Sequence, residues 1–385
     1  MCDSLDDRHK PGTRTVPLNE AIGTVLAHDI TEIRPGEFKG RAFKKGHVVR
    51  EEDVCHLQRL GKENLFVLHI AEDEMHENDA AYAIAHALMG SGVAIKGEPN
   101  EGKINIIAER DGLLKIDREM LLAFNMLGDV MCATLHHNML VKKGQTVAGT
   151  RAIPLVVKKN IIDEAVRIAE TLHHPLAKGG IGGGVIEVKE VRKPRAGVVI
   201  TGNEIYRGTI KDAFAPIIAR KIEEVGGEIV GVYYAPDEKE FIVDRLCELL
   251  NAGADLLITT GGMSVDPDDV TRFAIRDLGV SDITYGSAVL PGAMFLVGYL
   301  EQRTGARGHG RAGLDPGSRT LDPIPILGIP ACGMYAKITI FDLVLPRILA
   351  GEKIGRQDLA ELGHGGLCMK CEVCRYPVCP FGKSG

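Results

Sequence analysis

The 385-residue sequence lacks several features that would assign it to a membrane or secreted class. It has no uninterrupted run of roughly 18 apolar residues, which a transmembrane helix requires. Its first residues, Met-Cys-Asp-Ser-Leu-Asp-Asp-Arg, are polar and acidic and do not resemble a secretory signal peptide. We therefore expect a cytoplasmic protein that does not associate with a membrane.

The sequence also lacks an excess of positive charge. Its net charge is -6 and its isoelectric point is near 6.1, so no basic surface for nucleic acid is expected. Hydrophobic residues make up 45% of the chain and charged residues 25%, which is typical of a globular protein with a large core. The length allows about two or three domains.

Cysteine is sparse over most of the chain. Five of the nine cysteines are scattered, and a reducing compartment gives them no reason to form disulfides. Cys247, between leucines at 246 and 249, is typical of a small core residue.

The remaining cysteines are crowded near the end of the sequence, at Cys368, Cys371, Cys374 and Cys379. Two, two and four residues separate them, so their thiols can converge on a metal centre. Redox-active or unstructured thiols are the alternative. The run resembles a ferredoxin run with one extra residue before the last cysteine, which favours an iron–sulfur cluster over Zn²⁺ by a small margin.

Composition divides the chain into five predicted segments: an amino-terminal α+β module at 12–75, a strand-rich α+β region at 76–174, a linker at 175–195, an α/β domain at 196–352 and a cysteine-rich metal-binding tail at 353–385. The linker glycines lack the spacing and the leading strand of a dinucleotide-binding loop. Residues 301–323, rich in Gly, Arg and Pro, are predicted to form a surface insertion, with a lid over an anion site as the alternative.

Apolar strands alternate with amphipathic helices in the α/β domain. Strands are predicted at 196–201, 228–234, 255–260, 283–300 and 325–329, and helices at 211–225, at 237–249, up to 278, and at 334–349. Repeated β-α units of this size predict a doubly wound, mostly parallel sheet covered on both faces. Ligands of such sheets bind beyond the carboxyl ends of the strands.

Residues 255–272 are the most informative stretch of this domain, because an apolar strand leads directly into Gly261-Gly262 and three carboxylates. Glycines without Cβ atoms let backbone N–H groups approach a ligand closely. Asp266 or Asp268 could instead cap the following helix. A divalent cation that bridges the carboxylates to an anionic ligand is the other interpretation, and the loop alone favours neither.

A second loop, Thr201-Gly-Asn-Glu204, has the same chemistry. If the first and third strands are neighbours, both loops open onto one crevice. Their hydroxyl and N–H groups suit phosphate oxygens, while Glu204 and Asp269 could hold Mg²⁺. Asp212 and Asp237 lie at predicted helix starts and could equally serve as caps.

A set of motifs occurs in order along this domain: Thr201-Gly-Asn-Glu-Ile, Gly226-Gly227, Asp237, Thr259-Thr-Gly-Gly-Met-Ser-Val with Asp269, Pro291-Gly292 and Gly328-Ile-Pro330. Together they resemble the molybdopterin-binding domain that molybdopterin molybdotransferases share with molybdopterin adenylyltransferases. The resemblance covers residues 195 to about 350. It extends more weakly over residues 16–70, which are similar to the amino-terminal module of the molybdotransferases.

The resemblance implies a site for molybdopterin or its adenylylated form, with Mg²⁺ bound and molybdate as substrate. The implied catalytic residues are Glu204, Asp212 and Asp269. The implied molybdopterin-binding residues are Thr201, Gly202, Asn203, Thr260, Gly261, Gly262, Ser264, Pro291, Gly292, Gly328 and Pro330. Asn203 replaces an Asp of the family, Ala213 and Phe214 replace a Ser and an Asn, and Ala331-Cys-Gly333 replaces Gly-Asn-Pro. These departures weaken the inference of catalysis more than that of binding.

The resemblance thus implies a homodimeric enzyme of molybdenum cofactor biosynthesis that inserts molybdate and has acceptor molybdoenzymes as partners. A non-catalytic molybdopterin carrier or sensor with a metal-binding tail is the first alternative. A nucleotide pyrophosphatase of the competence- and damage-associated type is the second.

Overall fold

The computed structural model describes residues 13–34, 38–68, 70–171, 184–262, 270–303 and 320–383. The chain divides into two compact units. Unit 1 consists of Met1–Arg110, Lys115–Leu135 and Val141–Val188, and unit 2 of Asp111–Leu114, His136–Leu140 and Lys189–Gly385. None of the helices in the described ranges is long and apolar enough to cross a bilayer.

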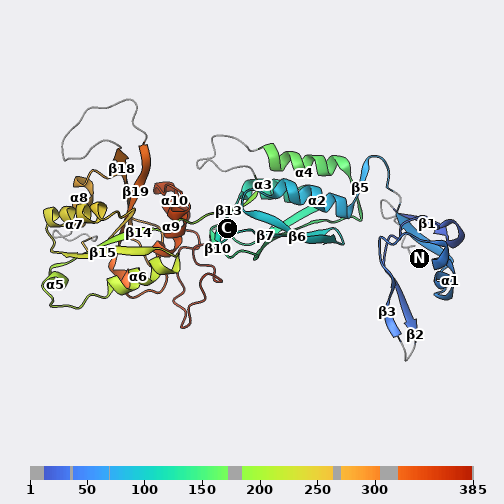
Figure 1. The fold of residues 1–385 in the computed structure, drawn as a ribbon, viewed down its shortest axis with the longest axis horizontal. Helices are drawn as coiled ribbons and strands as arrows, with labels where there is room; N and C mark the ends of the chain where they lie inside the picture. The colour runs from blue at the N-terminus through green and yellow to red at the C-terminus, as the bar shows by residue number, and fades with distance from the viewer. Residues whose placement is uncertain are drawn as a thin grey trace, which may run out of the picture. The chain divides into compact units, whose positions relative to one another are not determined.

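The first part of unit 1 is a small α+β module (Figure 1). Its elements are β1 (Thr13–Pro17), η1 (Leu18–Glu20), β2 (Ile30–Arg34), β3 (Phe38–Phe43), α1 (Glu51–Arg59) and β4 (Asn64–Leu68). Strands β1 and β4 pair antiparallel, as do β2 and β3. Val16, Leu26 and Leu57 are buried in its core.

The rest of unit 1 is built around a four-stranded antiparallel sheet of order β6-β7-β11-β9. The bounds are β6 (Val93–Asn100), β7 (Lys103–Ala108), β9 (Val130–Thr134) and β11 (Thr146–Ala152). The helix α2 (Glu77–Leu88) packs on this sheet, and several of the side chains on its buried face are alanines. The helix α4 (Lys159–Thr171) packs on α2. The other elements are β5 (Glu74–His76), β8 (Gly112–Ile116), α3 (Arg118–Asn125), β10 (Met139–Val141), β12 (Val156–Lys158) and β13 (Ile186–Lys189).

Unit 2 contains a six-stranded sheet of order β15-β14-β16-β19-β18-β17. Its strands are β14 (Arg195–Thr201), β15 (Glu228–Ala235), β16 (Leu256–Thr260), β17 (Ser281–Tyr285), β18 (Leu296–Arg303) and β19 (Thr320–Ile329). Strands β15, β14, β16 and β19 are parallel, β18 pairs antiparallel with β19, and β17 pairs antiparallel with β18, so β18 alone of these six strands runs in the opposite direction. This confirms the predicted mostly parallel α/β sheet, and β14 and β16 are neighbours.

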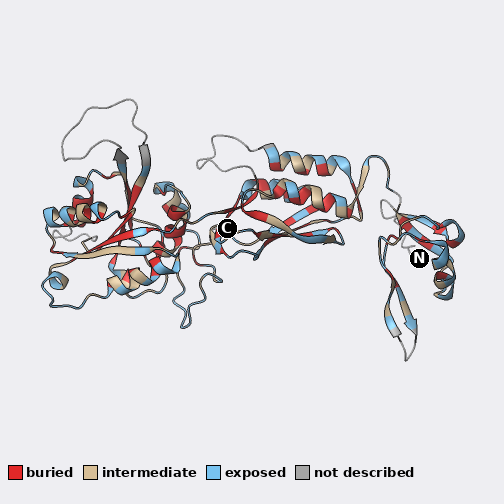
Figure 2. Ribbon diagram, in the orientation of Figure 1, coloured by how far each residue is buried: buried red, intermediate tan, exposed pale blue. Residues whose placement is uncertain are grey.

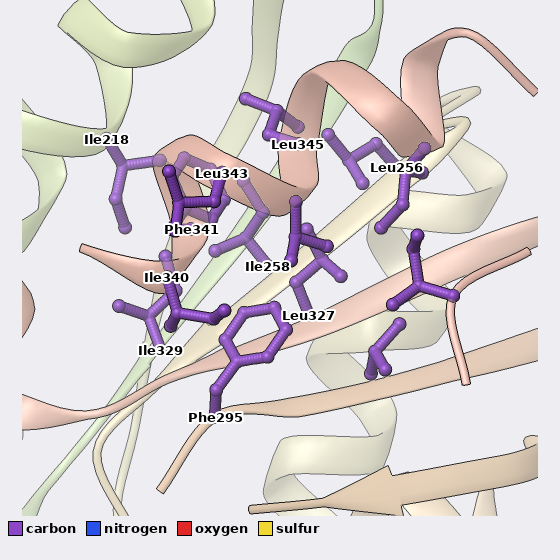
Figure 3. Packing of buried hydrophobic residues seen from close by; sticks show 14 of the residues in the cluster. Ile218, Leu256, Ile258, Phe295, Leu327, Ile329, Ile340, Phe341, Leu343 and Leu345 are labelled. Carbon is purple, nitrogen blue, oxygen red and sulfur yellow. The ribbon is translucent and has the colours of Figure 1, made fainter. Parts of the chain in front are cut away.

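Helices cover both faces of this sheet (Figure 1). The helices α6 (Phe214–Glu224), α9 (Ile340–Leu349) and α10 (Arg356–Glu361) share one hydrophobic cluster with the sheet, and α7 (Lys239–Asn251) and α8 (Thr271–Asp277) share the other. Figure 3 shows Phe295, Ile329 and Ile340 among the side chains of the first cluster. Strands β14 and β16 are buried along nearly all of their length (Figure 2), which explains their continuous apolar sequences.

Several predicted boundaries in unit 2 are wrong, and the strand predicted at 283–300 is divided between β17 and β18. The helix predicted at 334–349 is a short 3-10 turn, η2 (Ala331–Met334), followed by α9 from Ile340. The break occurs at Thr339, because its N–H donates to Asp342 and its hydroxyl accepts from the N–H of Phe341, which forms a capping box. The insertion predicted at 301–323 is shorter, because β18 continues to Arg303 and β19 begins at Thr320. Residues 304–319 lie outside the described residues.

Candidate functional site at the carboxyl edge of the sheet

Parallel pairing brings several predicted site residues to one edge of the unit 2 sheet. Thr260, the last residue of β16, pairs with Ile200 of β14 and with Ile329 of β19. The first residue of β18, Leu296, pairs with Gly328. We call this end of the sheet the carboxyl edge, and the loops at 201–204, 260–262, 291–295 and 328–330 all lie there.

Three threonines from two strands and a helix meet at this edge, and we call Thr201, Thr260 and Thr271 the threonine cluster. The hydroxyl of Thr201 donates to the carbonyl oxygen of Thr260 over 2.9 Å and lies 3.1 Å from the hydroxyl of Thr271. All three residues are buried. Among the described residues, the Thr260 hydroxyl oxygen has no hydrogen-bond partner. Such a group costs about 1–3 kcal/mol, so a ligand or water oxygen that bonds to it would be stabilised.

Positions 261 and 262 need glycine for two reasons, their backbone conformation and the close approach of neighbouring atoms. Their φ angles are +80° and +53°, in the left-handed region. A Cβ atom on Gly261 would lie 2.5 Å from the carbonyl oxygen of Thr201, and one on Gly262 would lie 2.3 Å from the hydroxyl of Thr271. The glycine pair thus lets the β16 loop pack directly on the threonine cluster.

The loop after β14 forms a single helical turn, α5 (Asn203–Tyr206). The N–H of Gly202 donates to Ala235 over 3.2 Å, and the N–H of Asn203 donates to the carboxylate of Asp237 over 3.0 Å. Both N–H groups are therefore used within the protein. Glu204 is exposed at the start of this turn, at the carboxyl edge.

Asp237 does not occupy the N-cap position that the sequence suggested for it. The N-cap residue of α7 is Glu238, and the Asp237 carboxylate accepts from the α5 loop instead. The predicted helix start is two residues early, because the chain turns after β15, where the N–H of Glu238 donates to the carbonyl of Pro236 over 2.7 Å, and α7 begins only at Lys239. Asp237 therefore positions the loop that carries Glu204.

Asp212 is a cap. Its carboxylate accepts from the N–H groups of Phe214 and Ala215 over 2.7 and 3.1 Å, at the start of α6. The hydroxyl of Tyr234 also donates to it over 3.2 Å. Burial raises the pKa of Tyr234, and the nearby negative charge of Asp212 raises it further. The sequence allowed Asp212 to be either a helix cap or an acid of the site, and its hydrogen bonds are those of a helix cap.

Several predicted site residues in the glycine-rich loop lie outside the described residues, namely Ser264, Asp266, Asp268 and Asp269. The following helix α8 has Val270 at its N-cap, so neither Asp266 nor Asp268 occupies that position. The side chain of Val270 cannot accept a hydrogen bond.

Two residues near this edge, Thr271 and Arg272, are not among the site residues that the sequence predicted. Arg272 is half-buried, and its guanidinium carbon lies 5.0 Å from the ring centre of Phe273 and 5.8 Å from that of Tyr285. Within the described residues, its Nε has no hydrogen-bond partner. The only sequence signal was the Thr-Arg pair two residues after Asp269.

Pro291, Gly292, Gly328 and Pro330 reach the carboxyl edge but are packed against neighbouring elements. Gly292 has a φ of +133°, and a Cβ atom there would lie 2.4 Å from the side chain of Ile340. The N–H of Ile340 donates to the carbonyl of Pro291 over 3.2 Å. Gly328 and Pro330 are buried at the end of β19. These residues fix the loops that surround the threonine cluster.

The four tail cysteines, together with Cys332, line one cavity of about 490 Å³ in unit 2. Cys371 and Cys374 are exposed, and the other three are half-buried. Across the described residues, no three His, Cys, Asp or Glu side chains come close enough together to hold one metal ion. The predicted thiols therefore share a cavity but do not converge on one point.

Comparison with known proteins identifies two regions of the chain. Residues 197–350 match the family model described as "Probable molybdopterin binding domain". Residues 15–69 match one described as "Domain of unknown function (DUF8806)".

Curated relatives and solved structures match part of the chain. A CinA-like protein of Mycobacterium avium is 37% identical over 89 residues, which cover 22% of this chain and 20% of the relative. A CinA-like protein of Thermosipho melanesiensis is 40% identical over 78 residues, covering 20% of this chain and 19% of the relative. The chain thus matches about a fifth of the length of these relatives. The structure of the tungsten cofactor synthesizing protein MoaB from Pyrococcus furiosus is 18% identical, with a TM-score of 0.31, and the match covers 42% of this chain and 98% of that one.

The family match spans the residues that form the strands β14, β15, β16 and β19 and the threonine cluster at their carboxyl edge. Unit 2 therefore contains a molybdopterin-binding domain at residues 197–350.

Proposed function

We propose that the protein takes part in molybdenum cofactor biosynthesis by binding molybdopterin, or its adenylylated form, at the carboxyl edge and promoting Mg²⁺-dependent insertion of molybdate. The threonine cluster is the observation that supports this most directly. It places hydroxyl groups, one of them buried and without a partner in the described residues, beside a glycine pair in a molybdopterin-binding domain. Phosphate oxygens accept hydrogen bonds from such groups.

Charged groups at the same edge would complete the site. Arg272 follows Thr271 in the chain and places its guanidinium over the ring of Tyr285, the last residue of β17, and such a cation suits an anionic ligand. Glu204 supplies an exposed carboxylate on the loop whose Asn203 N–H donates to Asp237, and we propose that it binds Mg²⁺ together with Asp269. Mg²⁺ would neutralise the phosphate charge that these carboxylates otherwise repel.

A non-catalytic molybdopterin carrier or sensor is the second candidate, and Asp212 favours it. Its carboxylate is already bonded to two backbone N–H groups of α6 and to Tyr234. An acid committed to capping has little capacity left for a metal ion or for proton transfer. The site then contains fewer acids than the sequence comparison implied.

Incubation of the full-length protein with adenylylated molybdopterin, Mg²⁺ and molybdate tests these functions. Release of AMP that depends on molybdate, with cofactor able to activate an apo-molybdoenzyme, supports insertion. Stoichiometric binding without turnover supports the carrier. AMP release that does not need molybdate supports a nucleotide pyrophosphatase, the other alternative that the sequence offers.

A homodimer in the cytoplasm that delivers cofactor to acceptor molybdoenzymes is part of the same proposal. Analytical ultracentrifugation of the purified chain tests the dimer. Co-purification with an apo-molybdoenzyme, compared with its cofactor-loaded form, tests delivery. Preference for the apo form is the result expected of a donor.

A further inference from the structure

A cavity in unit 2 brings together thiols from distant parts of the chain, and we call it the cysteine cavity. Cys332 reaches it from η2, just after β19. The tail contributes Cys368, Cys371, Cys374 and Cys379. Five of the chain's nine cysteines therefore line one cavity of about 490 Å³.

The walls of the cysteine cavity are held by hydrogen bonds. The N–H of Cys368 donates to the carbonyl of Leu290 over 2.8 Å, and the N–H of Leu290 donates to Gly366 over 2.8 Å. On the other wall, the buried ammonium group of Lys221 donates to the carbonyl of Lys337 over 2.9 Å. Phe381, next to the last cysteine, is buried in the hydrophobic core. The cavity is therefore built into unit 2.

The charge of the lining suits an anionic occupant. Lys337, Lys370 and Arg375 line the cavity, and no Asp or Glu is among its lining residues within the described chain. A metal centre ligated by several thiolates carries net negative charge, which nearby cations stabilise. The same lining would disfavour a bare divalent cation.

The arrangement of the thiols distinguishes between two kinds of metal centre. Structural zinc has four ligands about one ion, with sulfur at about 2.3 Å, and its site is closed. Here the five thiols line one cavity of about 490 Å³, a volume much larger than a single ion occupies. In a cluster, each thiolate binds a different iron atom, so ligands that surround a volume are what it requires.

The spacing of the tail cysteines agrees with this geometry. Two residues separate Cys368 from Cys371 and Cys371 from Cys374, and Pro380 follows Cys379. Bacterial [4Fe–4S] ferredoxins have the same intervals and the same terminal Cys-Pro pair, with one residue fewer before the last cysteine. The spacing of plant-type [2Fe–2S] proteins differs at the first interval.

We propose that the cysteine cavity holds a [4Fe–4S] cluster that the four tail thiols bind and that Cys332 contacts from the molybdopterin-binding domain. The assignment goes beyond the proposed function and does not depend on it. Cys332 lies two residues after Pro330. The backbone N–H of Cys368 donates a hydrogen bond to the carbonyl of Leu290, the residue before Pro291. The cluster would thus join two loops of the carboxyl edge to the tail.

The experiment uses the full chain, purified anaerobically and reconstituted with Fe²⁺ and sulfide. We expect about four iron and about four sulfide ions per chain, a broad visible absorption band, and an electron paramagnetic resonance signal after reduction. A colourless protein that holds zinc, or one that takes up no iron and sulfide, would overturn the proposal. The assay contains no pterin, so its outcome is separate from that of the proposed function.

Three variants test the ligands. Cys371→Ser and Cys374→Ser change exposed side chains and should lose the cluster while the circular dichroism melting curve of the reduced apoprotein stays unchanged. Cys55→Ser, an exposed cysteine in unit 1, is the matched control and should retain all of the iron. Equal iron contents in the three variants would contradict the assignment.

The role of Cys332 needs its own variant. Cys332→Ser should keep the iron and change the shape of the resonance signal, because a contact to the cluster is altered while its ligands remain. An unchanged signal would show that Cys332 makes no contact. Loss of iron would instead make Cys332 a ligand and overturn the set of four tail thiols.

Discussion

The threonine cluster and the cysteine cavity lie in the same unit but are built in different ways. The threonine cluster is closely packed. The Thr201 hydroxyl donates to the carbonyl oxygen of Thr260 over 2.9 Å and lies 3.1 Å from the Thr271 hydroxyl, and a Cβ atom on Gly261 or Gly262 would collide with the cluster. The cysteine cavity is open, and two of its thiols are exposed. The first suits a ligand that the preformed backbone recognises. The second suits an inorganic centre that brings its own geometry.

This difference predicts how each region responds to change. A closely packed site is sensitive to one added carbon atom, because neither the backbone nor the buried side chains can move far. An open cavity tolerates changes in size but is sensitive to loss of a ligand or of the contacts that hold its walls. The four predictions below test this contrast.

The largest effect on stability is expected at the wall of the cysteine cavity, at Asp342. Lys221 is 7% exposed and forms an ion pair with Asp342, which also caps α9. Asp342→Ala leaves the buried ammonium group with the Lys337 carbonyl but without a negative charge beside it, so the free energy of unfolding should fall by about 3–5 kcal/mol. Urea unfolding measures the change. Glu224→Ala is the matched control, because the Arg220–Glu224 pair is more than half exposed and should contribute at most about 1 kcal/mol. Equal losses in the two variants would show that the buried pair does not hold the wall.

The next effect is expected in the glycine pair, with Gly262→Ala compared with Gly279→Ala. Both glycines have a positive φ, so both variants carry backbone strain of about 1–3 kcal/mol. A Cβ atom on Gly262 would also lie 2.3 Å from the hydroxyl oxygen of Thr271, whereas in the described residues nothing lies within 4 Å of a Cβ atom on Gly279. Gly262→Ala should therefore lose about 1–3 kcal/mol more stability and bind molybdopterin at least tenfold more weakly. Thermal unfolding and fluorescence titration check both results, and equal behaviour would argue against a closely packed site.

A smaller and opposite effect on stability is expected at Thr260. Its hydroxyl is buried without a partner in the described residues, so Thr260→Val removes an unsatisfied group and should leave stability unchanged or raise it by about 1 kcal/mol. Thr201→Val is the comparison, since it removes the 2.9 Å hydrogen bond to Thr260 and should lower stability by about 1 kcal/mol. Both variants should weaken molybdopterin binding. If Thr260→Val binds as well as the unchanged protein, its hydroxyl does not contact the ligand.

The sequence predicted the carboxyl edge better than the cysteine cavity for physical reasons. Strands such as β14 and β16 are continuous apolar runs, and parallel pairing then brings residues 201 and 260 to one edge. The sequence pattern allowed the Asp212 and Asp237 carboxylates to cap a helix or to serve another role. Hydrogen bonds in the folded chain distinguish these roles, because Asp212 caps α6 and Asp237 accepts from the α5 loop. The participation of Cys332 depends on where η2 packs, and no spacing in the sequence indicates that.

The smallest effect is expected from pH, at the tail beside the cysteine cavity. Burial, together with the nearby negative charges of Asp342 and Cys379, raises the pKa of Tyr376 to about 12. In the unfolded chain the pKa is about 10, so the folded state alone keeps the proton between these values. The contribution of Tyr376 to stability is therefore complete below about pH 10 and falls as the pH rises toward about 12. Tyr376→Phe has no proton to lose, so its proteolysis at the tail should increase less over this range than that of the unchanged protein. Identical pH profiles for the two proteins would show that Tyr376 does not hold the tail in place.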